Sequence, residues 1–146
     1  MAEGAYGGSR GIARTYALVF GIAYLGVAIA ELIVGKDGLV LGDSTVLLYN
    51  ATLHNIIHFA TGLVVLGSAF SSEATAKMVA RVVGVMFLLV TVLNIVASNF
   101  YAELVGFPEG ATTPIAYTIV HAITAAAALY AGFAGSRGYG SSTAAA

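Results

Sequence analysis

Four long runs of apolar residues set what this chain can fold into. They cover residues 12–34, 46–70, 79–100 and 114–133 of the 146-residue sequence. Each run is long enough to cross the hydrocarbon core of a bilayer as a helix, which takes about 20 residues. Charged residues make up only 9% of the chain, against roughly 25% in soluble domains. We therefore predict an all-α integral membrane protein, a four-helix bundle over residues 12–133 whose surroundings are the lipid bilayer.

The segments outside the bundle are short. We predict that residues 1–11 form a mobile N-terminus and that residues 134–146 form a disordered tail of low complexity. A net charge of −1 gives no reason to expect nucleic acid as a partner, and the absence of cysteine excludes disulfides, thiolate metal sites and c-type haem attachment. No catalytic motif is recognisable, so the sequence does not indicate an enzyme.

The first apolar run shares one feature with signal peptides. The small-residue triplet Ala28-Ile29-Ala30 follows a basic start and precedes Glu31. However, the whole run is longer than the roughly 7–15 residues of a signal-peptide core. We therefore expect it to be retained as a helix.

Basic residues are distributed unequally between the two sets of helix ends. One set carries Arg10, Arg14, Lys77, Arg81 and Arg137, and the other carries only Lys36. Because cytoplasmic loops are enriched in lysine and arginine, we expect a multi-pass protein of the cell membrane with both termini in the cytoplasm.

Polar residues interrupt the second run at helical spacing. At 100° per residue, a sector about 80° wide contains Asn50, His54, His58, Thr61 and Ser68. Asn55 lies about 100° away from His54 and faces a different neighbour. Polar side chains at this depth are costly and need partners, so the stripe should point into the bundle.

The other three runs offer polar residues at a similar depth. Glu31 lies in the first run, Asn94 in the third and His121 in the fourth. With a rise of about 1.5 Å per residue, these residues and the histidines of the second run lie roughly 6–16 Å from the outer helix ends. The sequence thus predicts a polar cluster in the outer half of the bundle.

A weak internal repeat relates the two halves of the chain. The matched positions are Arg14 with Arg81 and Phe20 with Phe87, both 67 residues apart, and His58 with His121 and Thr61 with Thr124, both 63 apart. Because two helices per unit preserve orientation, this pattern predicts two tandem helix pairs in parallel repeat.

Three functions fit such a cluster. The first is structural: polar side chains, with Asn50, Asn55, Thr61 and Asn94 in support, hydrogen-bond across helices, each contact contributing roughly 0.6–2 kcal/mol. The protein would then be a membrane protein without a ligand, or a subunit of a homo-oligomer or a larger membrane complex.

The second function is binding of a divalent metal or haem b. His54 and His58 are spaced i, i+4, as in helical zinc sites. His121 and Glu31 would complete a set of three nitrogens and one oxygen. A bis-histidine haem would instead need His121 facing His54 or His58, with Gly62 making room.

The third function is movement of protons or ions by an oligomer, for which intramembrane histidine and carboxylate are the usual materials. The scarcity of polar groups in the inner half argues against a continuous path.

The segment LHNIIHFATG resembles the signature of a family of small bacterial, largely actinobacterial, four-helix membrane proteins classed as a domain of unknown function. The matching residues are His54, Asn55, His58 and Gly62. In the last helix His121 is present, but Ala125 stands where the family pattern has glycine. The resemblance implies the fold and a membrane location, and no activity.

Overall fold

Five helices and one short β-hairpin make up the described part of the chain. A computed structural model describes residues 11–35, 38–41, 45–107 and 113–134. The elements in chain order are α1 (Ile12–Val34), β1 (Leu39–Leu41), β2 (Thr45–Leu48), α2 (Thr52–Ser68), α3 (Glu73–Val96), α4 (Ser98–Val105) and α5 (Ile115–Phe133). The mobile N-terminus and the disordered tail were predicted for segments that lie almost wholly outside the described residues. The fold is helical as predicted, apart from the antiparallel hairpin of β1 and β2.

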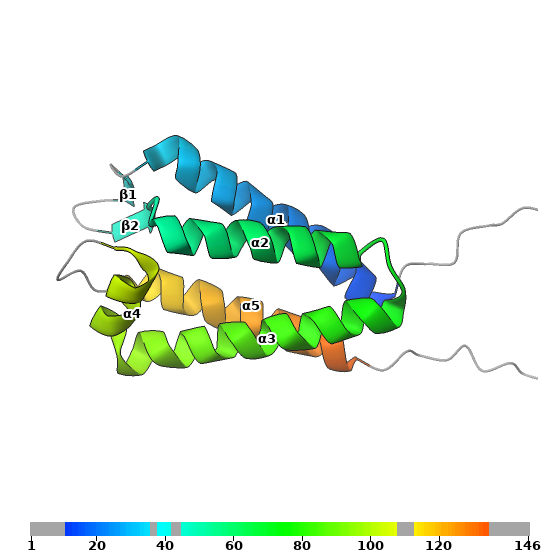
Figure 1. Ribbon diagram of the computed structural model, residues 1–146. Helices are drawn as coiled ribbons and strands as arrows, with labels where there is room; N and C mark the ends of the chain where they lie inside the picture. The colour runs from blue at the N-terminus through cyan, green and yellow to red at the C-terminus, as the bar shows by residue number, and fades with distance from the viewer. Residues whose placement is uncertain (1–10, 36–37, 42–44, 108–112, 135–146) are drawn as a thin grey trace, which may run out of the picture.

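The four long helices lie side by side in two pairs, α1 with α2 and α3 with α5 (Figure 1). The hairpin and α4 lie at one end of the molecule, called here the α4 end (Figure 1). At the other end, called the Glu73 end, α1 begins, α2 turns into α3, and α5 ends. Three of these helices, α1, α3 and α5, are long and apolar enough to cross a membrane, whereas α2 is apolar but has 17 residues.

The molecule exposes large apolar side chains and buries polar ones. Ile33 is 80% exposed and Leu89 is 65% exposed, whereas Glu31 is only 1% exposed. Large exposed apolar side chains occur on every long helix. Soluble monomers rarely expose apolar surface on this scale, so the outer surface is suited to lipid and the interior to polar contacts.

Glycines let the helices of each pair approach closely. A Cβ atom on Gly21 of α1 would lie 2.6 Å from the Cα of Leu66 in α2. A Cβ on Gly84 of α3 would lie 2.8 Å from the side chain of Leu129 in α5. Such contacts are typical of helix association in lipid, which depends on close packing of small residues.

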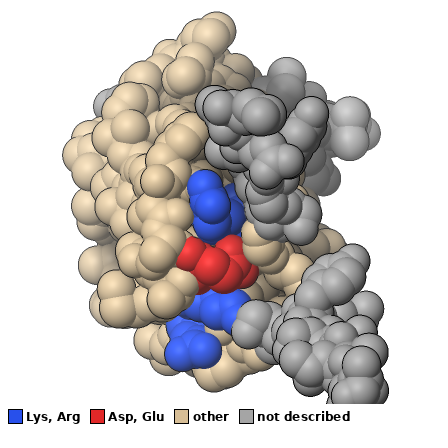
Figure 2. Space-filling model, turned by 90° about the vertical axis from the view of Figure 1, so that its right-hand side faces the viewer, with Lys and Arg blue, Asp and Glu red and all other residues tan. Residues whose placement is uncertain are grey.

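Glu73 joins the starts of α1 and α3. Its Oε1 accepts a hydrogen bond from the backbone N–H of Ala13 (2.9 Å), and its Oε2 accepts one from Arg14 (3.2 Å). The first N–H groups of a helix have no partner within the helix, so the Glu73 carboxylate caps α1 from outside it. Figure 2 shows this end of the molecule, where acidic atoms are flanked by basic ones.

Two arginines donate hydrogen bonds to the C-terminal ends of neighbouring helices. Arg14 Nε donates to the carbonyl oxygen of Ala69, just after α2 (3.0 Å), and Arg81 Nε donates to that of Gly132, near the end of α5 (2.8 Å). Both bonds supply donors to C-terminal carbonyls, which lack partners within their helix. The two bonds are related by the offsets of the sequence repeat.

The second helix begins later than expected. The predicted span is residues 46–70, but α2 begins at Thr52, and β2 includes the apolar residues from Val46 to Leu48. A short apolar run has the same pattern in a strand as in a buried helix. Asn50 therefore lies before α2, where its backbone N–H donates to the carbonyl oxygen of Gly35 (3.1 Å), and its placement on the helical stripe was wrong.

The third helix is displaced relative to the expected span of residues 79–100. It runs from Glu73 to Val96 and ends at Ala97, whose φ of −148° and ψ of 53° are not helical. The segment after it, expected to be irregular, begins with α4. At its end, Gly106 has a φ of 97°, and the N–H of Phe107 reaches back to the carbonyl oxygen of Ala102 (2.9 Å), as in a Schellman motif.

Candidate metal centre

Five buried polar residues from all four long helices meet near the α4 end. His54 lies in the first turn of α2 and His58 in the next, while His121 lies in the second turn of α5. Glu31 lies in the last turn of α1, and Asn94 lies in the last turn of α3. Two helices thus contribute from their first two turns and two from their last turns, which brings all five residues to one level of the bundle.

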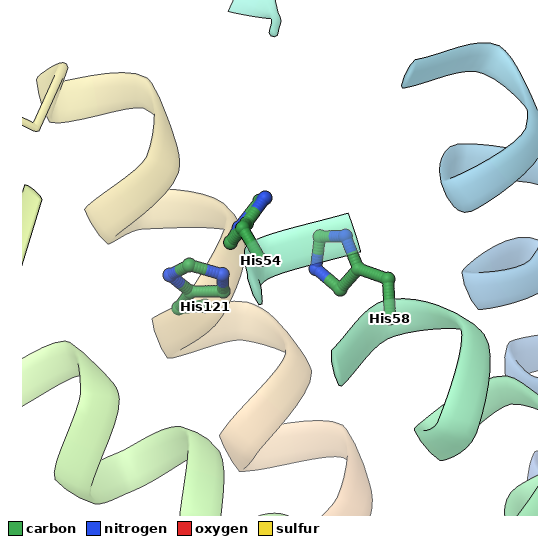
Figure 3. A group of neighbouring side chains, drawn as sticks. All are labelled: His54, His58 and His121. Carbon is green, nitrogen blue, oxygen red and sulfur yellow. The ribbon is translucent and has the colours of Figure 1, made fainter. Parts of the chain in front are cut away.

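The three histidines form a compact triangle. One ring nitrogen from each can be chosen so that all three lie within 4.8 Å of one another. The ring centroids of His54 and His58 are 4.1 Å apart, and that of His121 lies 6.1 Å from His54 and 6.4 Å from His58. In Figure 3, the rings of His58 and His121 each turn one nitrogen toward the space between them, beside His54. These are all the histidines of the chain.

Glu31 contacts both histidines of α2. Its Oε2 lies 3.4 Å from His58 Nδ1 and accepts a hydrogen bond from Asn55 Nδ2 (3.3 Å). Its Oε1 lies 3.1 Å from His54 Nδ1, without the alignment of a hydrogen bond. Asn55 Nδ2 also donates to the carbonyl oxygen of Ala28 (2.7 Å), so Asn55 ties α2 to α1 beside the carboxyl group.

Asn94 has the corresponding place beside His121. Its side-chain amide lies 3.2 Å from His121 Nδ1. Each histidine therefore has its Nδ1 next to a polar group of a neighbouring helix, Glu31 for two of them and Asn94 for the third. The Glu31 carboxyl group can accept the Nδ1 protons of His54 and His58, which leaves the lone pair on Nε2, and this is how outer polar groups orient histidines toward a metal. At His121 the neighbouring atom is the amide nitrogen Asn94 Nδ2, which donates to Nδ1. Rotation of this amide by 180° would bring Oδ1 to the same place as an acceptor.

The cluster also contains unpartnered polar atoms. In the described residues, the buried side-chain polar atoms without a hydrogen bond are Glu31 Oε1, His54 Nδ1, His54 Nε2, Asn94 Oδ1 and Tyr117 Oη. All five belong to the cluster or to its direct neighbour, since the ring of Tyr117 lies 5.7 Å from that of His54. Buried polar atoms in native structures usually have partners, so this concentration marks the cluster as a candidate binding site.

Aromatic residues cover the cluster at the α4 end. Tyr101 and Phe107 pack with Tyr117 in a small core of their own, and the Phe107 ring lies 6.1 Å from that of His54. Burial, and secondarily the negative charge of Glu31, raises the pKa of Tyr101 to about 12. Its phenol therefore stays neutral, and the cover has no charge that would draw water in.

The sequence-predicted site residues do not all belong to this cluster. His54, His58, His121, Glu31, Asn55 and Asn94 lie in it. Thr61 is buried farther along the same face of α2, and Asn50 precedes the helix. Tyr117 was missed as a site residue, although it follows His54 by the same 63 residues that separate His58 from His121.

The triangle fits a single metal ion better than haem. A tetrahedral zinc ion with Zn–N distances of about 2.0–2.1 Å holds its nitrogens roughly 3.3 Å apart, which small side-chain rotations would reach from the present spacing. A haem between His58 and His121 would have its porphyrin where the ring of His54 lies. His58 and His121 could therefore hold a haem between them only if the ring of His54 moved away.

The helices and the cluster together define the class, an α-helical membrane protein with a buried group of histidines. The chain belongs to the family described as domain of unknown function DUF4383, whose family model matches residues 14–134. The predicted membership of an uncharacterised family is thereby confirmed, while its His-Asn-x-x-His signature and actinobacterial distribution stay predictions. No curated protein and no solved structure matches the chain.

Proposed function

We propose that this protein is a metal-binding protein of the cell membrane, in which His54, His58 and His121 hold one divalent transition-metal ion. The observation that carries the proposal is the coincidence of three converging imidazoles with all the unpartnered buried side-chain atoms of the described residues. Glu31 contacts His54 and His58 from outside the triangle, and Asn94 contacts His121.

A purely structural role explains the cluster less well. Hydrogen bonds between helices stabilise a membrane protein when both partners are satisfied, yet His54 Nδ1 has only a poorly aligned contact with Glu31 Oε1, and His54 Nε2 has no partner. Leaving a buried polar atom without a partner costs about 1–3 kcal/mol. A bound ion would engage His54, and a water molecule on that ion would offer hydrogen bonds to the neighbouring oxygen atoms.

Zinc is the metal that the donor set favours. Three imidazole nitrogens with an open fourth position are typical of zinc sites, and imidazole also suits copper, iron and nickel. Calcium and magnesium prefer oxygen ligands, and the triangle offers nitrogen. We therefore expect zinc, with the other imidazole-binding metals as competitors.

We further propose that α2 crosses the membrane with the other three long helices, which makes a bundle of four spans with both termini in the cytoplasm. Although α2 is short, it packs along the full-length span α1. The matching Arg14 and Arg81 bonds support a tandem repeat of two helix pairs. The Glu73 end, which carries the basic residues of the described ranges, Arg14, Lys77 and Arg81, is then cytoplasmic.

The test is the metal content of the purified protein. Protein made in zinc-supplied cells and purified without chelator should contain about one zinc ion per chain by elemental analysis, as a three-histidine site implies. His54→Gln, His58→Gln and His121→Gln should each deplete the metal, because an amide is a much poorer ligand than imidazole. A Glu103→Gln variant, changed on the exposed surface of α4, serves as the control and should retain it.

Acidification should release the ion. Metal binding requires neutral imidazole, so protonation competes with the metal and its affinity falls as the pH is lowered. Dialysis over a range of pH, followed by elemental analysis, measures the release. Wild-type protein that is folded but carries no zinc, copper, iron or nickel at neutral pH would remove the proposal and leave the packing role.

A further inference from the structure

A cavity of about 430 Å³ lies beside the histidine cluster, between α1 and α5. Phe20, Tyr24 and Val27 line it from α1, and Val120 and Ile123 line it from α5. Its volume lies within the roughly 300–1,000 Å³ of small-molecule sites. Two of the proposed metal ligands, His58 and His121, line it on the side of the cluster.

Buried polar residues form part of the cavity lining. They include Glu31, His58, His121, Tyr117 and Thr124. His58 is the most exposed of the three histidines, at 8% against 2% for His54 and 4% for His121. A molecule in the cavity would therefore reach His58 first.

The outer part of the cavity opens toward lipid. Val120 and Ile123 are 59% and 62% exposed, and Ala23 opposite them is also exposed. Both helices that form this opening, α1 and α5, are long and apolar enough to cross a membrane. A molecule that enters here comes from the hydrocarbon of the bilayer, so it must be lipid-soluble.

Charge restricts the kind of molecule further. The lining includes the carboxyl group of Glu31 and no lysine or arginine. In the metal-free protein, a fatty-acid carboxylate or a lipid phosphate would meet a like charge without a counter-charge, which is strongly unfavourable at low dielectric. The polar end of the occupant should therefore be neutral.

The walls favour a flat ring. Tyr24 of α1 and Phe87 of α3 stack at a centroid distance of 5.5 Å, and Phe87 lies 5.4 Å from the ring of His121. Aromatic walls of this kind favour planar ligands through stacked or edge-to-face contacts. We propose that the cavity binds a lipid-soluble quinone or its quinol, with the ring against Tyr24 and Phe87 and an oxygen atom toward His58.

This inference goes beyond the proposed metal site, because it depends on the walls of the cavity and not on a bound ion. Photolabelling with an azido-quinone bearing a ten-carbon tail tests it, using full-length protein in liposomes. Mass spectrometry should find the label on residues 20–27 and 116–124. Excess unlabelled quinone should suppress the labelling, and palmitate should not.

Matched variants sharpen the test. Ala116→Phe, in the α5 wall, should reduce labelling to about a tenth by steric exclusion. Ala122→Phe introduces the same ring at an exposed position of α5 that does not line the cavity, and should leave labelling unchanged. A wild-type level of labelling in the Ala116→Phe variant would overturn the inference.

Two further outcomes decide between this inference and others. Label spread equally over the exposed face of α3, or suppressed as well by palmitate as by quinone, would show general partitioning of lipid-soluble molecules and overturn the proposal. Specific labelling of metal-free protein would support it even where the metal proposal fails.

Discussion

At the scale of single residues, Glu31 determines the polar interior. Its carboxyl group is almost fully buried and contacts three side chains of α2: His54, Asn55 and His58. An acidic residue within a spanning helix is tolerated when it faces the interior and has partners. Here one carboxyl group provides an oxygen atom for each of two imidazoles, an arrangement that an amide cannot reproduce because only one of its two end atoms is an acceptor.

We therefore predict that Glu31→Gln weakens zinc binding by about 10- to 100-fold, the usual effect of losing a polar partner of a ligating histidine. Equilibrium dialysis against a competing chelator measures this affinity. The control is Glu103→Gln, which makes the same change on the exposed surface of α4. Equal affinities in the wild type and the Glu31→Gln variant would show that Glu31 does not orient the ligands.

Helical spacing was enough to place most of the cluster. The i, i+4 relation of His54 and His58 predicts one face of α2, and similar depths predict that Glu31, Asn94 and His121 reach the same level. The same method could not find Tyr117 as a site residue, because a tyrosine on an apolar face is most often core. Only the structure shows that its hydroxyl lacks a partner.

At the scale of secondary-structure elements, α1 carries two kinds of glycine. Gly21 faces α2 with backbone atoms of Leu66 close by, whereas a Cβ atom on Gly26 would meet nothing within 4 Å. Gly21 thus allows close helix packing, whereas Gly26 borders open space.

We predict that Gly21→Ala destabilises the protein by about 1–3 kcal/mol, the usual cost of overpacking a tight interface. Gly26→Ala should leave stability unchanged or raise it by up to about 1 kcal/mol, because alanine is the better helix former. Unfolding in mixed detergent measures both variants. A loss at Gly26 equal to that at Gly21 would contradict this packing.

The hairpin and α4 were harder to predict than the long helices. A run of about 20 apolar residues indicates a spanning helix on length alone, but the apolar residues Val46–Leu48 fit a strand as well as a helix. The segment around α4 lies mostly between the predicted runs 79–100 and 114–133, and no separate helix was predicted there. Its helical character depends on burial of Tyr101, Ala102 and Val105 against the bundle, which local sequence does not show.

At the scale of the whole molecule, the two ends differ in charge and shape. The Glu73 end carries Arg14, Lys77 and Arg81 around the acidic cap of α1, and the α4 end carries the hairpin and the aromatic cover. This asymmetry motivates the proposed orientation, with the Glu73 end in the cytoplasm. An association into homo-oligomers or with other membrane proteins stays a prediction.

Because the chain has no cysteine, single introduced cysteines test the orientation cleanly. Cysteine at Ser72, exposed at the Glu73 end, should be shielded from an impermeant thiol reagent in intact cells and should react once the cells are permeabilised. Cysteine at Asn99, exposed in α4, should react in intact cells. The reverse pattern would invert the proposed topology.

The division of polar contacts between the helix pairs bears on how the protein enters the membrane. Glu31 finds its partners on α2, and Asn94 finds its partner on α5, so the contacts of each are made within one pair. A nascent chain released into lipid one helix at a time would carry an unpaired carboxyl group into hydrocarbon. If the chain leaves the translocon as two successive helix pairs, α1 with α2 and then α3 with α5, each pair brings its own hydrogen-bond partners. The histidine triangle forms only when the second pair joins the first.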